Sequence, residues 1–239
     1  MNPETSEGRA FGGDPSVAGA PSSSSGVDYP SVRGRVTEIR ADGGLLAFLE
    51  SLADNIDRRQ ASEGHSRDMA RWAGLVAMEL ELDDDRQWAC STAARLHAIG
   101  KVVVPESILN KKGPLSAEEW ELVQSHPAQG ADIIKLATGF EKVADVIRQH
   151  QERFDGTGYP EGKSGVEISL EARIVAVCGA WAAMRATRPY RAALTRDQAR
   201  TELETGSGTE FDPEVVRAFL LLEAAEEWNR SAPSPVPAG

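Results

Sequence analysis

The chain has 239 residues, of which 41% are apolar and 26% are charged, as in an ordinary soluble globular protein. Its formal net charge of −11 argues against a nucleic-acid backbone as the main partner, because Lys and Arg must neutralise the phosphates in such binding. No stretch approaches the roughly 20 consecutive apolar residues of a membrane span. Because Cys90 and Cys178 are the only cysteines and no secretory signal is apparent, we expect reduced thiols and a cytoplasmic location.

Segments of low complexity lie at both ends of the chain. Residues 1–36 are dominated by Gly, Ser, Pro and Ala, and residues 231–239 have a similar composition. Such segments contain too few large apolar side chains to offset the entropy lost on ordering. We therefore expect a disordered arm over 1–36 and a disordered tail over 231–239.

Between these segments, apolar residues recur every three or four positions, which is the spacing of one face of a helix. Alternating strand patterns are nearly absent, and residues 101–105 form the only short β-like run. The chain is therefore predicted to be an all-α helical bundle, with an N-terminal helical segment over 37–60 and one domain over 61–230. The apolar stripes that support this prediction lie within 45–52, 69–80, 88–96, 120–126, 140–150 and 174–181.

Several helix boundaries can also be predicted. Ser116 with Glu119, and Thr195 with Gln198, have the spacing of a capping box. Asp212 followed by Pro213 is typical of a helix start. Pro127 is expected to interrupt the helix that carries His126, because proline lacks the amide hydrogen that a helix interior needs.

Histidine is rare, and its four copies are His65, His97, His126 and His150. Each lies at the end of an apolar stripe, so each ring is expected to point towards the core. A single histidine in such a place is more often a hydrogen-bonded core residue than a ligand. Four such residues from four helices favour a shared metal site, because helical bundles build metal sites from facing helices.

Two further groups of residues could contact a phosphate. The segment from Arg153 to Pro160 contains Gly156, Gly158, Tyr159 and Pro160, and this composition predicts a tight loop whose amides could hold an anion. An ordinary connection between helices is the simpler interpretation. Lys101 and Arg188 suit phosphate recognition, although exposed cations without any ligand are equally common.

Together these segments resemble the HD-GYP family, a branch of the HD-domain metal-dependent phosphohydrolases. The resemblance extends from His65 to Phe219. The segments that carry it are Leu96-His97-Ala98-Ile99-Gly100-Lys101, Ile108 to Leu115 with Glu118-Glu119-Trp120 and His126-Pro127, His150 to Pro160, Arg188-Pro189-Tyr190-Arg191, and Phe211-Asp212-Pro213.

The resemblance implies a helical domain with two or three metal ions, usually iron or manganese, that hydrolyses the bacterial messenger cyclic di-GMP to pGpG or GMP. In that chemistry the metals polarise a phosphoryl oxygen and activate a water molecule. The four histidines would be metal ligands. Lys101, Arg188 and the loop from Gly156 to Pro160 would face the substrate. Family members often carry an N-terminal sensor domain, and none is identifiable here.

Several ligand positions of the family pattern carry other residues in this chain. Ala98 stands where the aspartate of the His-Asp pair would be, Gln151 where a second histidine would be, and Gly179 where another aspartate would be. A glutamate that some members place before the first histidine corresponds to Ala61. Four neutral imidazoles could bind one divalent cation, but they would not compensate two closely spaced ones.

Three functions follow from this pattern. The leading hypothesis is a degenerate, non-catalytic or weakly active receptor or interaction module in cyclic di-GMP signalling. The alternative is a phosphodiesterase acting on cyclic di-GMP or another phosphoester through an altered site with one Fe, Mn, Ni or Zn ion. The third is a scaffold whose histidines form a polar core without metal.

The expected partners follow from the same pattern. The ligand is expected to be cyclic di-GMP or a related nucleotide. A signalling-protein partner and a homodimer are both compatible with the chain. Binding to DNA or to a membrane is not expected.

Overall fold

The computed structural model describes residues 39–40, 43–60, 62–187 and 192–231. The predicted arm, nearly all of the predicted tail, Ala61 and Arg188 lie outside these residues. Ser231, the first residue of the predicted tail, is the last residue of α10. No helix in the described residues is long and apolar enough to cross a membrane.

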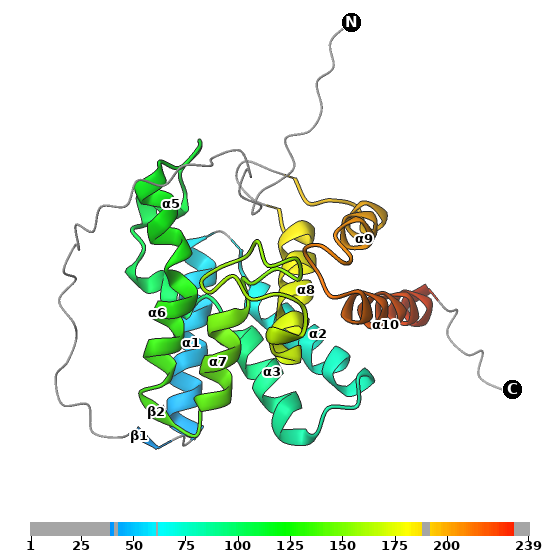
Figure 1. The fold of residues 1–239 in the computed structure, drawn as a ribbon, viewed down its shortest axis with the longest axis horizontal. Coiled ribbons are helices and arrows are strands. Elements are labelled where there is room, and N and C mark those ends of the chain that lie inside the picture. Colours follow the sequence, from blue (N-terminus) through cyan, green and yellow to red (C-terminus); the bar gives the residue numbers. More distant parts are fainter. Residues whose placement is uncertain (1–38, 41–42, 61, 188–191, 232–239) are drawn as a thin grey trace, which may run out of the picture. The chain divides into compact units, whose positions relative to one another are not determined.

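The described part of the chain is a bundle of helices, which confirms the predicted all-α class (Figure 1). Two-residue strands β1 (Ile39–Arg40) and β2 (Ala137–Thr138) pair in parallel. The other elements are α1 (Gly43–Arg59), α2 (His65–Glu79), α3 (Asp84–Leu96), η1 (Ile99–Val103), α4 (Glu106–Leu109), α5 (Ala117–Gln124), α6 (His126–Ile134), α7 (Glu141–Gln149), η2 (Gly165–Glu167), α8 (Leu170–Arg185), α9 (Arg196–Thr205) and α10 (Pro213–Ser231).

The apolar faces of these helices form one core. Helix α2 packs against α3 and α8, α6 packs against α7 and η1, and α10 packs against α2 and α8. Phe219 of α10 lies between Trp72 of α2 and Trp181 of α8, with ring centroids 4.9 and 5.2 Å apart. Burial of such aromatic side chains contributes strongly to a core. These contacts explain why the apolar stripes recur at helical spacing.

Most of the local signals at the helix ends behave as predicted. Both capping boxes form, at Ser116 with Glu119 and at Thr195 with Gln198. The Asp212 carboxylate accepts a hydrogen bond from the amide of Glu214 at 2.7 Å, which caps α10. Pro127 does not interrupt the helix that carries His126, because the break between α5 and α6 falls at Ser125. Pro127 instead lies in the first turn of α6, where a missing amide hydrogen has no cost.

The β-like run over 101–105 does not form a strand. Residues 99–103 form the 3-10 helix η1, in which Val102 and Val103 are exposed. The reason lies in close packing next to it, since a Cβ atom on Gly100 would lie 1.9 Å from the carbonyl oxygen of His126. This contact holds η1 against the start of α6, so tertiary packing overrides the β preference of the valines.

Candidate functional site

The four histidines come together from four different places in the sequence. His65 begins α2, His97 follows α3, His126 begins α6 and His150 follows α7. Neighbouring ring centroids lie 5.5 Å apart for His65 and His97, 5.5 Å for His97 and His150, and 5.3 Å for His126 and His150. The imidazoles therefore form a row from the buried His126 to the half-buried His65.

Three of the rings are fixed in the same way. The Nδ1 atom of each lies close to the carbonyl oxygen three residues earlier, at 2.9 Å in His97, 2.7 Å in His126 and 2.6 Å in His150. Because a carbonyl oxygen only accepts hydrogen bonds, each Nδ1 must carry the proton. In a neutral ring the Nε2 atom then carries the lone pair, which is the form that binds a metal.

Burial keeps these rings neutral at pH 7. It lowers the pKa of His97 and His126 well below the ordinary value, and the Lys101 ammonium adds to the effect. Burial also lowers the pKa of His150 to about 4. The Nε2 atoms of His126 and His150 are 3.4 Å apart, so two lone pairs face each other with no proton between them. A cation would relieve this repulsion.

Lys101 lies in η1, beside the histidine row. Its Nζ atom donates a hydrogen bond to Oε1 of Gln60 at 3.0 Å, and its side chain is half-buried. Its charge lowers the pKa of His97, His126 and His150. This position is consistent with the predicted phosphate anchor, a role that stays a prediction.

The positions that depart from the family pattern supply no carboxylate to the row. Ala98 is buried directly after His97. A Cβ atom on Gly179 would lie 3.1 Å from Cε of Met69, so the methionine fills the space in front of this glycine. Gln151 accepts a hydrogen bond from the Tyr159 hydroxyl at 3.3 Å through Oε1. The side-chain oxygen of Gln151 is therefore hydrogen-bonded to the loop.

Glu152 serves the loop as well. Its carboxylate is buried and accepts hydrogen bonds from the amides of Glu161 at 2.7 Å and Lys163 at 3.1 Å. Sequence reasoning did not identify this role. The available signal was its place directly before an irregular loop, where unpaired amides need an acceptor.

Within the described residues, no group of three or more His, Cys, Asp or Glu side chains is arranged to hold a metal ion. The imidazoles pack edge to face, and their nitrogen atoms do not converge on one point. The residues present therefore do not fit two cations bridged by carboxylates. They fit a single cation between His126 and His150, because imidazole nitrogen suits borderline metals such as Zn, Ni and Fe.

The loop after His150 is tightly built. Its Tyr159–Pro160 peptide bond is cis, and a Cβ atom on Gly158 would lie 2.3 Å from the backbone nitrogen of Arg153. The amides of Gly156, Thr157 and Tyr159 donate hydrogen bonds within the loop. These three amides are therefore already hydrogen-bonded within the loop, and an anion site at the loop stays a prediction. Contacts of the Tyr159 and Pro160 side chains with a substrate stay a prediction.

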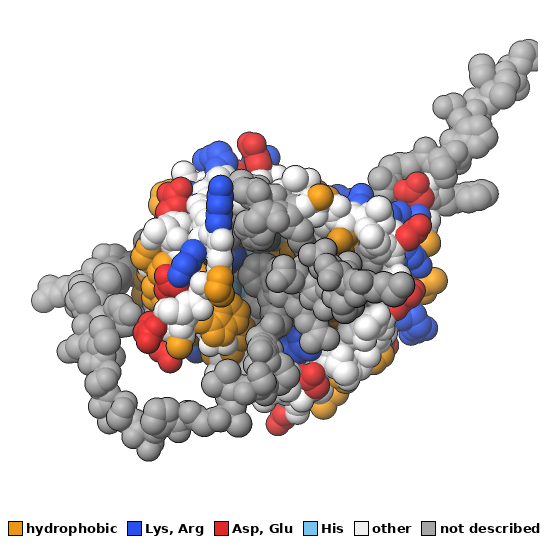
Figure 2. All heavy atoms as spheres, turned by 90° about the horizontal axis from the view of Figure 1, so that it is seen from above, with side chains coloured by type: hydrophobic (Ala, Val, Ile, Leu, Met, Phe, Trp, Pro, Cys, Tyr) orange, Lys and Arg blue, Asp and Glu red, His pale blue; other side chains and the backbone are white. Residues whose placement is uncertain are grey.

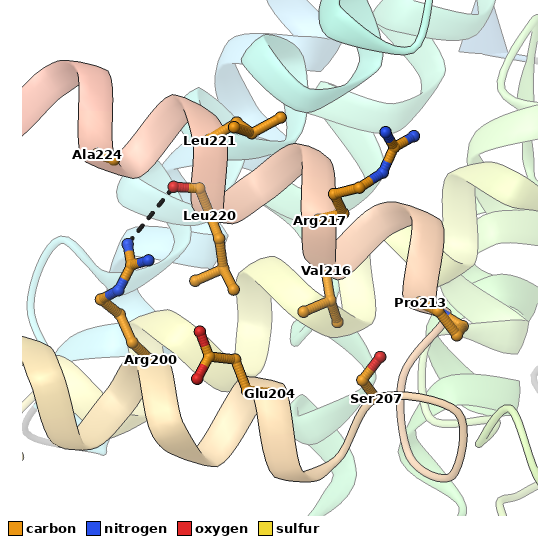
Figure 3. A pocket seen from close by; sticks show the side chains of 9 residues that line it. All are labelled: Arg200, Glu204, Ser207, Pro213, Val216, Arg217, Leu220, Leu221 and Ala224. Carbon is orange, nitrogen blue, oxygen red and sulfur yellow. Dashed lines mark hydrogen bonds between the residues drawn. The ribbon is translucent and has the colours of Figure 1, made fainter.

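The described surface contains hollows at two places that bear on the site. One, of about 270 Å³, is lined by His65 and by Trp181 of α8. The other, of about 430 Å³, lies between α9 and α10 and is lined by Arg200, Val216 and Leu220 among others (Figure 3). None of the four histidines lines the second hollow. Of these two hollows, the one beside His65 is connected with the candidate site.

Figure 2 shows basic and acidic side chains interspersed over the described part of the face seen from above. The described part of this face therefore differs from the uniformly basic surfaces that bind nucleic acids.

The fold and the histidine row can be compared with known proteins. A family model described as HD domain matches residues 50–215. The chain belongs to the HD-domain family. Its relatives and the segment from His150 to Pro160 place it among the HD-GYP proteins of that family, as the sequence predicted.

The relatives of this HD-GYP protein include enzymes that act on cyclic dinucleotides. It is 42% identical over 157 residues to the 3'3'-cGAMP-specific phosphodiesterase 3 of Vibrio cholerae, covering 65% of this chain and 34% of the relative. It is 38% identical over 195 residues to the cyclic di-GMP phosphodiesterase response regulator RpfG of Xanthomonas campestris, covering 81% of this chain and 47% of the relative. The chain thus spans less than half the length of either relative.

A solved structure supports the fold. The crystal structure of a cyclic GMP-AMP specific phosphodiesterase of V. cholerae aligns with a TM-score of 0.60 and 22% identity, covering 77% of this chain and 50% of that one. At this identity the likeness shows the helical HD-domain fold alone.

Proposed function

We propose that the chain is a metal-dependent phosphodiesterase that hydrolyses cyclic di-GMP or a related cyclic dinucleotide and uses a single divalent cation. The observation that carries this proposal is the pair of Nε2 atoms of His126 and His150, which face each other at 3.4 Å with both Nδ1 protons directed to carbonyl oxygens. The named activities of the relatives give the reaction type. Weak turnover is expected because the carboxylates that would hold further cations are missing.

The residues of the row have separate roles in this proposal. His126 and His150 would hold the cation, which supplies Lewis-acid polarisation of a phosphoryl oxygen and lowers the pKa of bound water. His97 continues the row to His65, which borders the pocket on the surface. The ammonium group of Lys101 would compensate the charge of the phosphate in this partly dry environment.

A second candidate function is a receptor that binds the nucleotide without cleaving it. The observation that favours it is the lack of acidic side chains at Ala98 and Gly179, together with the use of Glu152 by the loop. A cytoplasmic location, a signalling-protein partner and a homodimer stay predictions under either function.

One experiment separates the two functions. The metal content of the purified protein is measured, and turnover of cyclic di-GMP and cyclic GMP-AMP is followed with added iron, manganese, nickel and zinc. The phosphodiesterase proposal expects up to one metal per chain and turnover that is lost in His150→Ala. Nucleotide binding without turnover under any metal would favour the receptor, and the lack of both binding and turnover would reject both functions.

A further inference from the structure

The pocket of about 270 Å³ beside His65 lies between α2 and α8. Its α2 wall carries His65, Asp68 and Trp72, which follow one another at helical spacing and so share one face of the helix. Its α8 wall carries Trp181 and Arg185, one turn apart. The candidate site is therefore continuous with a cavity that has both aromatic and charged walls.

The two tryptophans in the pocket wall are fixed by packing. Trp72 and Trp181 both pack on Phe219, and only 5% and 7% of their surfaces are exposed. A wall fixed in this way loses little conformational entropy when a planar ligand lies against it. The two tryptophans therefore present a fixed but small apolar surface to the pocket.

The charged groups determine which ring fits. Asp68 and Glu63 are exposed carboxylates, and neither forms an ion pair with any residue that the structure describes. Arg185 donates a hydrogen bond to the carbonyl oxygen of Leu194 at 2.5 Å. Two acidic groups against one basic group give the pocket an excess of negative charge. Such a pocket favours a ligand edge made of N–H donors over an edge made of acceptors.

The volume limits the ligand further. Pockets for small ligands usually measure about 300–1,000 Å³. A pocket of about 270 Å³ therefore holds one base and not a complete cyclic dinucleotide. Guanine has two adjacent N–H donors, N1–H and the N2 amino group, which a carboxylate can accept together. Adenine has a ring acceptor at the corresponding position, and this atom would face the carboxylate unfavourably.

We propose that this pocket binds one guanine base of the cyclic dinucleotide, with Asp68 accepting hydrogen bonds from N1–H and the N2 amino group. The base contacts the small exposed part of Trp181, and the phosphodiester lies towards His65. The inference rests on the proposed function of the site and adds the residue that determines base specificity. Asp68 is assigned this role because it lies on rigid α2, on the same face as His65 and Trp72.

The test compares two nucleotides on matched variants. Affinities for cyclic di-GMP and cyclic di-AMP are measured by calorimetry on the purified protein, with the ligand verified as intact after each titration. Asp68→Asn is expected to weaken cyclic di-GMP binding roughly 10- to 100-fold, as expected for loss of a bidentate charged contact, and to change cyclic di-AMP binding less than about threefold. The control is Asp84→Asn, since Asp84 is also an exposed acid in the first turn of a helix but lies outside the pocket.

Each result has a separate meaning. If the unmodified protein binds cyclic di-GMP and Asp68→Asn binds it equally well, the base assignment is overturned and the proposed function stands. An equal loss for both nucleotides would also overturn it, because a general electrostatic effect does not distinguish bases. If the unmodified protein binds neither nucleotide, the base assignment and the proposed function both fail.

Discussion

The three buried imidazoles share one arrangement, in which a backbone carbonyl holds Nδ1–H and leaves Nε2 to face the interior. Because the proton on Nδ1 is already used, protonating such a ring places an unsolvated charge on Nε2 among other rings. Burial accordingly lowers the pKa of His97, His126 and His150. The three imidazoles are therefore neutral at pH 7, and protonation in acid is expected to destabilise their buried arrangement.

The free energy of unfolding is expected to fall as the pH decreases. The pKa of His150 is about 4 in the folded chain and 6.5 in the unfolded reference, so between these values the unfolded chain binds more protons. Above pH 6.5 His150 is neutral in both states and does not reduce the free energy of unfolding. Between pH 6.5 and pH 4 the free energy of unfolding falls by up to about 1.4 kcal/mol per pH unit. Urea unfolding of chelated protein at pH 7.5, 6 and 5 measures this slope. His150→Gln should flatten it, and equal slopes in the two proteins would contradict the prediction.

Restoring acidic ligands is expected to increase metal binding. Ala98→Asp, Gln151→His and Gly179→Asp together should raise metal content from at most one to two ions per chain, because the added carboxylates compensate a second dication. The end of Met69 must move by a few tenths of an ångström to admit a side chain at position 179. Metal analysis after dialysis is the measurement, with Ala47→Asp on the exposed face of α1 as the control for added charge. Unchanged metal content in the triple variant would reject the assignment of these positions.

Among the elements, the loop after α7 is organised by its own hydrogen bonds and by a distant segment. Glu152 accepts amides from Glu161 and Lys163, while the amides of Phe154 and Asp155 donate to the carbonyl oxygens of Glu210 and Thr209. This network joins the loop to the segment between α9 and α10. The loop is therefore a rigid structural unit beside His150.

Gly158→Ala is expected to destabilise the protein by about 1–3 kcal/mol. The added Cβ atom would meet the backbone nitrogen of Arg153 at 2.3 Å, and backbone atoms cannot move aside as a flexible side chain can. Gly113→Ala is the matched control, because its Cβ atom would have no neighbour within 4 Å, and a change below about 0.5 kcal/mol is expected. Chemical denaturation provides both values. Equal stability of the two variants would show that the loop tolerates a side chain at position 158.

In the molecule as a whole, the packing of α10 connects the core with the candidate site. Phe219 supports both tryptophans of the pocket wall. Glu223, one turn further along α10, is buried and binds Arg196 and Arg200 of α9. Burial alone would raise the pKa of Glu223, but the hydrogen bonds from the two arginines lower it below the ordinary value. The α9–α10 pair is thus fixed by a buried carboxylate.

Glu223→Gln is expected to cost about 1–3 kcal/mol of stability, since it leaves two guanidinium groups without their counter-charge. The partial exposure of both arginines keeps the loss below that of a fully buried pair. Glu226→Gln removes a more exposed partner of Arg71, and a loss below about 1 kcal/mol is expected. Thermal unfolding distinguishes the two variants, and a larger loss in Glu226→Gln would refute the ranking.

Much of this structure could be predicted from the chain because the signals are local. Helix spacing, the capping boxes at Ser116 and Thr195, and the proline at the start of α10 depend on residues within a few positions of one another. The valines of η1 were misleading because a distant contact, between Gly100 and the start of α6, decided their conformation. The role of Glu152 was not predicted because the amides that it accepts, those of Glu161 and Lys163, lie 9 and 11 residues further along the chain.

The sequence by itself determined the helical class, the family and the four histidines, since each depends on short motifs and regular spacing. Only the tertiary structure decided that the Nε2 atoms of His126 and His150 face each other, that Glu152 is used by the loop, and that His65 opens to a pocket with acidic and aromatic walls. The physical reason is that hydrogen-bond partners, burial and cavities arise from residues far apart in the chain. A motif can place a side chain near a site, but only packing determines what it contacts.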